Sequence, residues 1–179
     1  RRAVQVGTVL REMGWDTLPV FPPMGSEFPN YLAEHGFRSA TLSLSRLRRQ
    51  RKIWGILRYL FRFPIEVWSL MLLFRKHRVD LVHANSLFAF QAVVAARLMG
   101  RPVVWHFNDM ALPRALCVFV TKCLAPLATM RVYSSRKVQT FHRDSNEEVT
   151  ALLHPPVDLD RFKPSGAWRK SEGELRLIA

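Results

Sequence analysis

Residues 101–109 read RPVVWHFND, and residues 79–86 read VDLVHANS. Each stretch is a short apolar run that passes directly into polar residues, and a helix-length amphipathic segment separates the two. This succession predicts neighbouring strands of a parallel α/β sheet. In open sheets of this kind the binding crevice lies outside the carboxyl ends of the strands. The polar residues at these ends are therefore the first candidates for a functional site: His83, Asn85, Ser86, His106, Asn108 and Asp109.

The same alternation of helix and strand extends along the chain in both directions. Upstream we expect a helix over 1–14, a strand over 17–21, a helix over 27–35 and a strand over 37–44. A long basic helical segment over 45–78 follows, which Pro64 should kink or split. Downstream we expect strands over 80–84, 101–107, 130–133 and 150–153, with helices over 86–100, 112–128 and 134–144. The predicted fold class is α/β, with a parallel sheet flanked by helices.

Composition restricts the partners that the chain can have. Hydrophobic residues make up 49% of the sequence, enough for a packed core. The formal net charge of +13 favours a polyanionic partner such as nucleic acid, anionic lipid or a phosphorylated substrate. Zinc-finger spacing, ribonucleoprotein-type aromatic motifs and an obvious recognition helix are all missing from the sequence. We therefore expect no nucleic-acid partner.

The cysteines and the missing catalytic motifs exclude several kinds of chemistry. Cys117 and Cys123 lie six residues apart in a predicted helix, and the roughly 9 Å between their Cα atoms is too long for an unstrained disulfide. This favours a reducing, cytosolic setting.

The serines of the pair Ser134-Ser135 lack the Gly-x-Ser-x-Gly elbow of a hydrolase. The sequence also has no phosphate-cradling glycine loop, carboxylate pair or metal-ligand cluster, so we expect no metal and no cofactor.

The segment from Arg46 to Arg62 carries seven basic residues and no acid. On a helical wheel four arginines share one face, and Ile53, Ile56, Leu57 and Leu60 lie opposite. A cationic face beside aromatic residues is typical of a helix that lies on an anionic membrane. The predicted membrane contacts are Arg48, Arg51, Trp54, Arg58 and Arg62. Alternatively, the apolar side packs on the sheet and the arginines are simply solvated; the two interpretations are compatible.

Five segments, in order, resemble the N-terminal half of a family-4 (group 1) glycosyltransferase of GT-B architecture. In the last of them, Val157, Asp158, Phe162 and Pro164 match the family's connector to its second domain, while Pro155-Pro156 replaces the usual asparagine-glycine. The five segments are RRAVQVGTVLREMGWD (1–16), DLVHANS (80–86), RPVVWHFND (101–109), RVYSSRKVQTFH (131–142) and LLHPPVDLDRFKP (152–164).

The resemblance implies a Rossmann-like acceptor-side domain over 1–162 whose first strand is missing, a linker over 163–174, and the start of a truncated donor-binding domain over 175–179. The full-length protein would transfer a hexosyl group from a nucleotide sugar to a glycan or lipid-linked acceptor, retaining the anomeric configuration and using no metal. The missing domain would bind most of the donor, so this fragment alone would be inactive. Cell-envelope polysaccharide synthesis in the cytoplasm, peripherally on the inner membrane face, is the expected setting.

The resemblance also assigns roles to the strand ends. Asp109 would face the cleft as a catalytic residue, together with Asn108, which stands where the family often has histidine. The substrate-binding candidates are Asn85, Ser86, His106 and Ser135. Alternatively, Asn108 and Asp109 cap the next helix, as Ser86 and Ser135 would cap theirs. The alternative for the whole chain is a non-enzymatic Rossmann-like module that binds an anionic surface or ligand.

Overall fold

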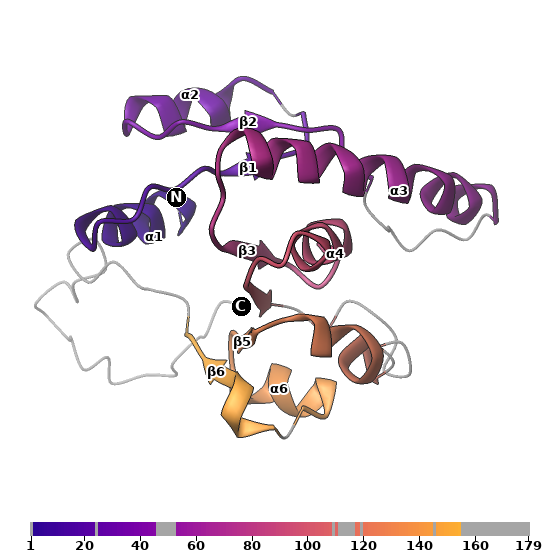
Figure 1. Ribbon diagram of the computed structural model, residues 1–179. Helices are drawn as coiled ribbons and strands as arrows, with labels where there is room; N and C mark the ends of the chain where they lie inside the picture. The colour runs from indigo at the N-terminus through magenta and orange to yellow at the C-terminus, as the bar shows by residue number, and fades with distance from the viewer. Residues whose placement is uncertain are drawn as a thin grey trace, which may run out of the picture.

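The computed structural model describes residues 2–23, 25–45, 53–108, 110, 117, 118, 120–144 and 146–154 of the 179-residue chain. Helices and strands alternate through this part of the chain, as the sequence predicts (Figure 1). In order the elements are α1 (Arg2–Glu12), β1 (Val20–Phe21), α2 (Glu27–Glu34), β2 (Ala40–Thr41), α3 (Ile53–Lys76), β3 (Val82–Asn85), α4 (Phe90–Leu98), β4 (Val103–Phe107), the π-helical turn η1 (Val120–Leu124), the 3-10 turn η2 (Ala125–Leu127), β5 (Met130–Tyr133), α6 (Arg136–His142), the 3-10 turn η3 (Glu147–Val149) and β6 (Thr150–Leu152).

The strands form two parallel sheets within the described residues, β1-β2 and β3-β4-β5-β6. In the larger sheet Asn85 pairs with His106, and Phe107 pairs with Tyr133. Because these strands are parallel, their carboxyl ends lie at one edge of the sheet. The predicted parallel α/β architecture is therefore confirmed.

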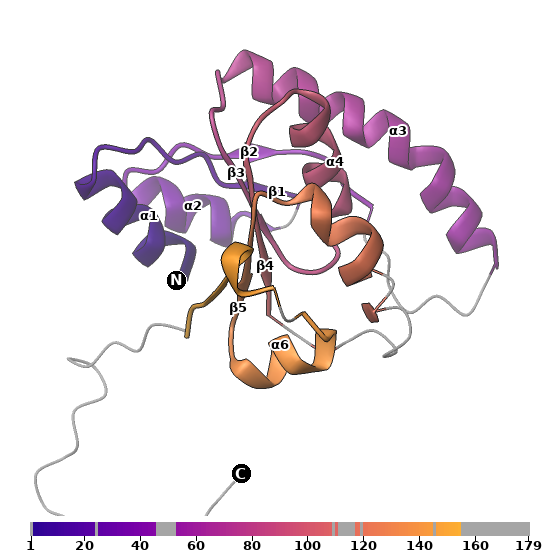
Figure 2. The ribbon, with the colours of Figure 1, turned by 60° about the horizontal axis from the view of Figure 1, so that its bottom comes forward.

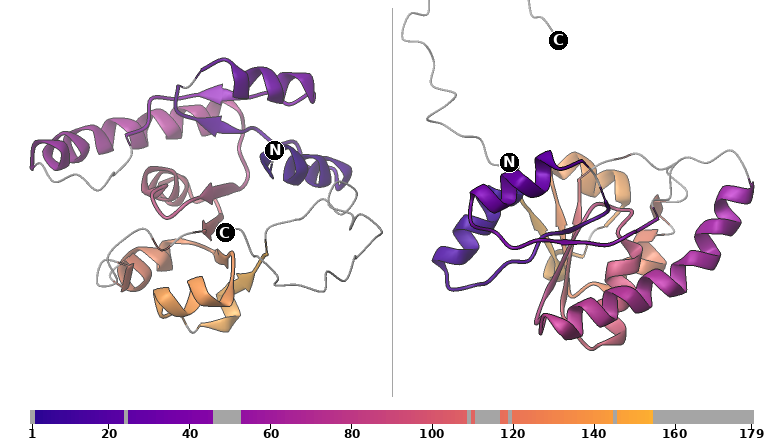
Figure 3. Two further views of the ribbon diagram at one scale, coloured as in Figure 1. Left: turned by 180° about the vertical axis from the view of Figure 1, so that it is seen from behind. Right: turned by 90° about the horizontal axis from the view of Figure 1, so that it is seen from above.

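The main core lies between the larger sheet and helices α3 and α4. Figures 2 and 3 show α3 running along one side of the strands, with α1 and α2 on the other side. The largest fully buried side chains are Trp105, Tyr133, Phe107, Leu32, Leu70 and Leu87. A smaller cluster joins α1 and α2, and there Gly7 leaves room for Phe37, whose ring atom Cε1 would lie 2.7 Å from a Cβ at position 7. Aromatic side chains of the neighbouring strands β4 and β5 thus pack together and stabilise the sheet whose strand ends carry the candidate site.

Several predicted boundaries differ from the structure. Pro64 does not divide its helix, because it lies on the exposed side of α3, where the carbonyl group left without an N–H partner can be hydrated. Both N-terminal strands are shorter than predicted, and the helix predicted over 86–100 begins only at Phe90. Where the predicted helix 112–128 is described, it ends in the π-helical and 3-10 turns η1 and η2. Cys117 and Cys123 are not joined by a disulfide.

Candidate functional site

Two asparagine side chains meet at the carboxyl edge of the larger sheet. Asn85 ends β3, Asn108 directly follows β4, and the Nδ2 of Asn108 donates a hydrogen bond of 2.5 Å to the Oδ1 of Asn85. The Oδ1 of Asn108 is buried and has no hydrogen-bond partner among the described residues. A buried amide oxygen without a partner is uncommon, because its desolvation is then uncompensated. This amide pair is the centre of the candidate site.

The end of β5 completes this edge through two serines. Ser134 donates its backbone N–H to the carbonyl of Phe107 (3.1 Å) and its Oγ–H to the carbonyl of Asn108 (3.3 Å). Ser135 caps α6, since its Oγ accepts the N–H of Val138 (3.3 Å), which confirms the predicted cap. β5 therefore fixes the backbone that carries Asn108.

Ser86 has a backbone conformation that differs from the predicted helix cap. Its φ is +112°, in a region that residues with a side chain rarely adopt, and α4 begins four residues later with Ala89 as its N-cap. The prediction that Ser86 caps this helix is therefore wrong. Long-range contacts impose the conformation: its N–H donates to the carbonyl of His106 (3.0 Å), and its carbonyl accepts the indole N–H of Trp105 (3.0 Å). Such strain costs about 1–3 kcal/mol and is concentrated at functional sites.

The two histidines of these strands form a stacked pair. The rings of His83 and His106 lie 5.7 Å apart, centroid to centroid, with an angle of 15° between their planes. His106 is buried, and partial burial of the His83 ring lowers its pKa below the ordinary value. His83 thus stacks on His106 while the residue remains partly exposed to solvent, and its neutral form is favoured. His106 stacks on His83 and lies two residues before Asn108. Its candidate role in binding is therefore that of a neighbour to the amide pair.

The structure therefore brings together four of the predicted site residues, Asn85, Ser86, Asn108 and Ser135, at one edge of the sheet. Asp109, the predicted catalytic carboxylate, lies outside the described residues, as do Arg48 and Arg51. Within the described residues, no group of three or more His, Cys, Asp or Glu side chains is arranged to hold a metal ion. The groups available at this edge are amides and hydroxyls, which suit the hydroxyl groups of a sugar.

Residues 1–161 match the model of Glycosyltransferase Family 4. The chain belongs to this family. Among curated proteins no sequence matches it.

Two solved structures share the fold of this family-4 chain. A glycosyltransferase from Rickettsia africae ESF-5 is 15% identical and superposes with a TM-score of 0.66, over 93% of this chain and 42% of the other. MurG from Acinetobacter baumannii is 20% identical, with a TM-score of 0.56 over 76% of this chain and 38% of the other. This chain thus spans less than half the length of either protein. At these identities the likeness shows the Rossmann-like GT-B fold of an N-terminal half.

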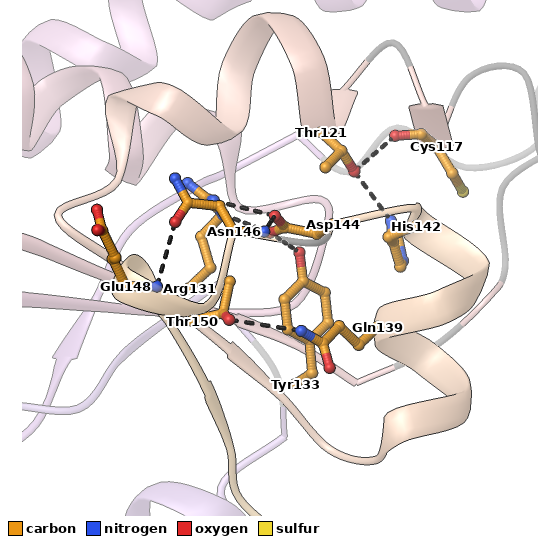
Figure 4. Close-up of polar contacts among 10 residues, drawn as sticks. All are labelled: Cys117, Thr121, Arg131, Tyr133, Gln139, His142, Asp144, Asn146, Glu148 and Thr150. Carbon is orange, nitrogen blue, oxygen red and sulfur yellow. Dashed lines mark hydrogen bonds and ion pairs between the residues drawn. The ribbon is translucent and has the colours of Figure 1, made fainter.

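A buried ionic network behind this edge supports β5 (Figure 4). The Nε of Arg131 donates to the Oδ2 of Asp144 at 2.5 Å, its Nη2 donates to Oδ1 at 3.0 Å, and the hydroxyl of Tyr133 donates to Oδ2 at 2.6 Å. Burial opposes ionisation of Asp144, but the hydrogen bonds from Arg131 and Tyr133 outweigh it and lower the pKa of this carboxyl. Burial and the same carboxylate raise the pKa of Tyr133. The sequence analysis did not identify this network, although an arginine within the apolar strand RVY is a signal for a buried carboxylate partner.

His142, which is fully buried on α6, is a second structural support for this edge of the sheet. Its Nδ1 lies 3.5 Å from the Oγ1 of Thr121, and that hydroxyl donates to the carbonyl of Cys117 at 2.9 Å (Figure 4). The ring also packs against Phe107, with 5.1 Å between centroids. η1 and α6 are thereby fixed to the strand that precedes Asn108.

A concave region lies beside β2, away from the amide pair. A cavity of about 610 Å³ is lined by Pro23, Thr41, Leu42, Ser43, Arg62, Ile65, Glu66 and Ser69. The carboxylate of Glu66 is buried and accepts hydrogen bonds from the N–H and hydroxyl of Ser45 and from the amide of Gln91. Arg62, a predicted membrane contact, lies one helical turn away, with its Nε 3.3 Å from that carboxylate. Burial, together with the charge of Glu66, raises the pKa of Tyr59 to about 12.

Proposed function

We propose that the protein carrying this chain transfers a sugar from a nucleotide-sugar donor to an acceptor, and that the carboxyl edge of β3, β4 and β5 holds the acceptor. The observation that carries the proposal is the Asn85–Asn108 amide pair, which lies at this edge in a family-4 chain. Amides and serine hydroxyls both donate and accept hydrogen bonds, as recognition of a sugar hydroxyl requires. The nucleotide sugar is a substrate, so we propose no resident cofactor and no metal.

The reaction proposed is hexosyl transfer with retention of anomeric configuration. Asp109 and Asn108 would face the reacting groups, while Asn85, Ser86, His106 and Ser135 would bind or position the acceptor. The charge that develops on the leaving diphosphate would be stabilised mainly by residues outside 1–162. Hydrogen-bond donors already positioned around such a charge stabilise the transition state most strongly. Residues 163–174 would link this acceptor-side domain to the donor-binding one that begins near residue 175.

The acceptor proposed is a glycan or a lipid-linked glycan of a cell-envelope polysaccharide. The enzyme would work in the cytoplasm, peripherally on the inner membrane face, and would not bind nucleic acid. The net charge of +13 supports an anionic surface as a partner. Among the helices that the structure describes, none combines the length and apolar character needed to cross a bilayer.

The test is a transfer assay with the intact protein, a panel of nucleotide sugars, and both free and lipid-linked glycan acceptors. We expect a glycosylated product with the donor's anomeric configuration, measured by NMR. Asp109→Asn should lower kcat by about a hundredfold or more if this carboxylate acts on a reacting proton. Asp80→Asn is the matched control, because Asp80 is an exposed residue before β3. No transfer with any donor, or equal rates for both variants, contradicts the assignment.

The second candidate is the non-enzymatic module that binds an anionic surface or ligand, which the strongly basic composition favours. The same assay separates the two, because a binding module releases no nucleotide from any donor. Residues 1–179 alone serve as a control: the proposal expects them to transfer nothing, and turnover by this chain alone would contradict the division into acceptor-side and donor-binding domains.

A further inference from the structure

Helix α3 exposes a continuous apolar stripe to solvent. It consists of Trp54, Leu57, Phe61, Ile65, Trp68 and Leu72, with side chains between 38% and 78% exposed. Their spacings of three or four residues return each side chain to the same face of the helix. At about 1.5 Å per residue the stripe is roughly 27 Å long. We call these six residues the α3 stripe.

The packing of α3 on the protein does not use this stripe. The opposite face supplies Val67, Leu70 and Phe74 to the core, each at least 94% buried. Helix α3 therefore packs on the core with one apolar face and exposes a second apolar face to solvent. Exposed single hydrophobic residues are ordinary, but six in a row that include two tryptophans indicate a surface that is covered in use.

The structure also corrects the predicted orientation of this helix. One of the two interpretations of the sequence places Leu57 and Leu60 against the sheet, with the arginines turned away from it. Instead, Leu57 and Leu60 are exposed, and Arg62 lies against the buried carboxylate of Glu66. The pattern of residues 53–62 alone is misleading because the core contacts of α3 come from its second half, from Val67 onward.

The charges around the stripe indicate what covers it. Arg58 and Lys76 are exposed, and both lie roughly 55° from the centre of the stripe on a helical wheel. Glu66 is the sole acid in α3, and its carboxylate is buried by Ser45 and Gln91. The exposed part of α3 thus carries cations and no anion, and five more basic residues precede it in the sequence at 46, 48, 49, 51 and 52. Apolar and cationic groups side by side complement the acyl chains and phosphates of anionic lipids.

We propose that α3 lies in the plane of an anionic membrane, with the α3 stripe inserted at the boundary between headgroups and acyl chains and with Arg58 and Lys76 against lipid phosphates. Trp54 and Trp68 suit this depth, because tryptophan is enriched at membrane interfaces. The contact is by the apolar face, and the cationic flank adds electrostatic attraction. The inference is independent of the transfer reaction.

The test is binding of the intact protein to vesicles of phosphatidylcholine containing anionic phosphatidylglycerol, compared with phosphatidylcholine alone. The stripe variant is Phe61→Ser with Trp68→Ser, and both side chains are exposed, so the fold should be retained, as circular dichroism would verify. Each lost side chain should lower the partition coefficient about tenfold, and the pair about a hundredfold. The matched control is Met13→Ser with Leu98→Ser, two comparably exposed apolar residues, one directly after α1 and one at the end of α4, which should bind as the wild type does.

Two further measurements test the cationic contact and the insertion of the tryptophans separately. Arg58→Gln should weaken binding to the anionic vesicles about fivefold, whereas Lys122→Gln, at an exposed position on η1, should not. Brominated lipids should quench Trp54 and Trp68 and leave Trp105 unquenched, because Trp105 is fully buried.

Wild-type binding that the stripe variant retains would overturn the proposal, and so would absence of vesicle binding. If ultracentrifugation shows a dimer that the stripe variant dissociates, the occupant is a second copy and the lipid proposal is wrong. Transfer to a water-soluble acceptor, assayed without vesicles, reports on the proposed function separately: the stripe variant should keep wild-type activity there, and a failure of that reaction leaves the vesicle result unaffected.

Discussion

A single carboxylate holds the segment after α6 against β5. Asp144 is buried, and three donors, Arg131, Tyr133 and the N–H of Asn146, converge on it. Removal of one partner of such a buried pair leaves the other charge without compensation, which destabilises by about 3–5 kcal/mol. The consequence reaches the candidate site, because Arg131 and Tyr133 belong to the strand whose end carries Ser134 and Ser135.

Asp144→Ala should therefore lower the free energy of unfolding by about 3–5 kcal/mol at pH 7, measured by urea denaturation. The matched control is Asp16→Ala, since Asp16 pairs with Arg38 at the surface and such pairs contribute less than about 1 kcal/mol. Equal losses for the two variants would contradict the structural role of Asp144.

The pH dependence of stability follows from the same carboxyl. Its pKa is lower in the folded chain than in the unfolded one, so the folded state favours the ionised form. The stabilisation is therefore fully present above the unfolded pKa, near 3.8, and is lost as the pH falls through the folded value. Urea midpoints measured from pH 6 down to pH 2.5 should decrease more steeply for the wild type than for Asp144→Asn. Parallel profiles would contradict this.

At the scale of elements, α3 runs unbroken through Pro64. A proline inside a helix removes one backbone hydrogen bond and disfavours the preceding turn, at about 3 kcal/mol relative to alanine. The exposure of Pro64 allows the helix to continue, since water can reach the carbonyl that lost its partner.

Pro64→Ala should consequently raise the free energy of unfolding, by up to about 3 kcal/mol, as measured by urea denaturation. Pro29→Ala is the control, because Pro29 stands in the first turn of α2, where no backbone hydrogen bond is lost and proline is tolerated. A lower free energy of unfolding for Pro64→Ala would contradict this prediction. It would mean that the proline gives α3 the shape that its packing contacts require.

The strands of the larger sheet follow from local pattern, whereas other features depend on contacts far along the chain. The runs DLVHANS and RPVVWHFND are apolar and end in polar residues, so their parallel pairing and the shared edge of Asn85 and Asn108 were predictable. The left-handed conformation of Ser86 was not, because the indole of Trp105 and the carbonyl of His106 impose it. Nor was the outward face of α3, since the helix has apolar residues on both sides and only the packed structure distinguishes them.

At the scale of the whole molecule, we assign different roles to two surfaces. We propose that the edge at β3, β4 and β5 presents hydrogen-bonding groups to an acceptor and that the α3 stripe presents apolar side chains to a membrane. The chain spans 42% of the Rickettsia africae structure and 38% of the Acinetobacter baumannii one, so the donor would be bound mostly outside this domain. The central claim is therefore that this family-4 domain recognises the acceptor rather than the donor.

Acceptor and donor saturation kinetics of the intact protein test this claim most directly, with Asn85→Ala and Asn108→Ala compared with Asn30→Ala, an exposed asparagine on α2. Loss of one hydrogen bond to a sugar hydroxyl should raise the acceptor KM about fivefold to tenfold and leave the donor KM unchanged, with Asn30→Ala like the wild type. A raised donor KM with an unchanged acceptor KM would contradict the account.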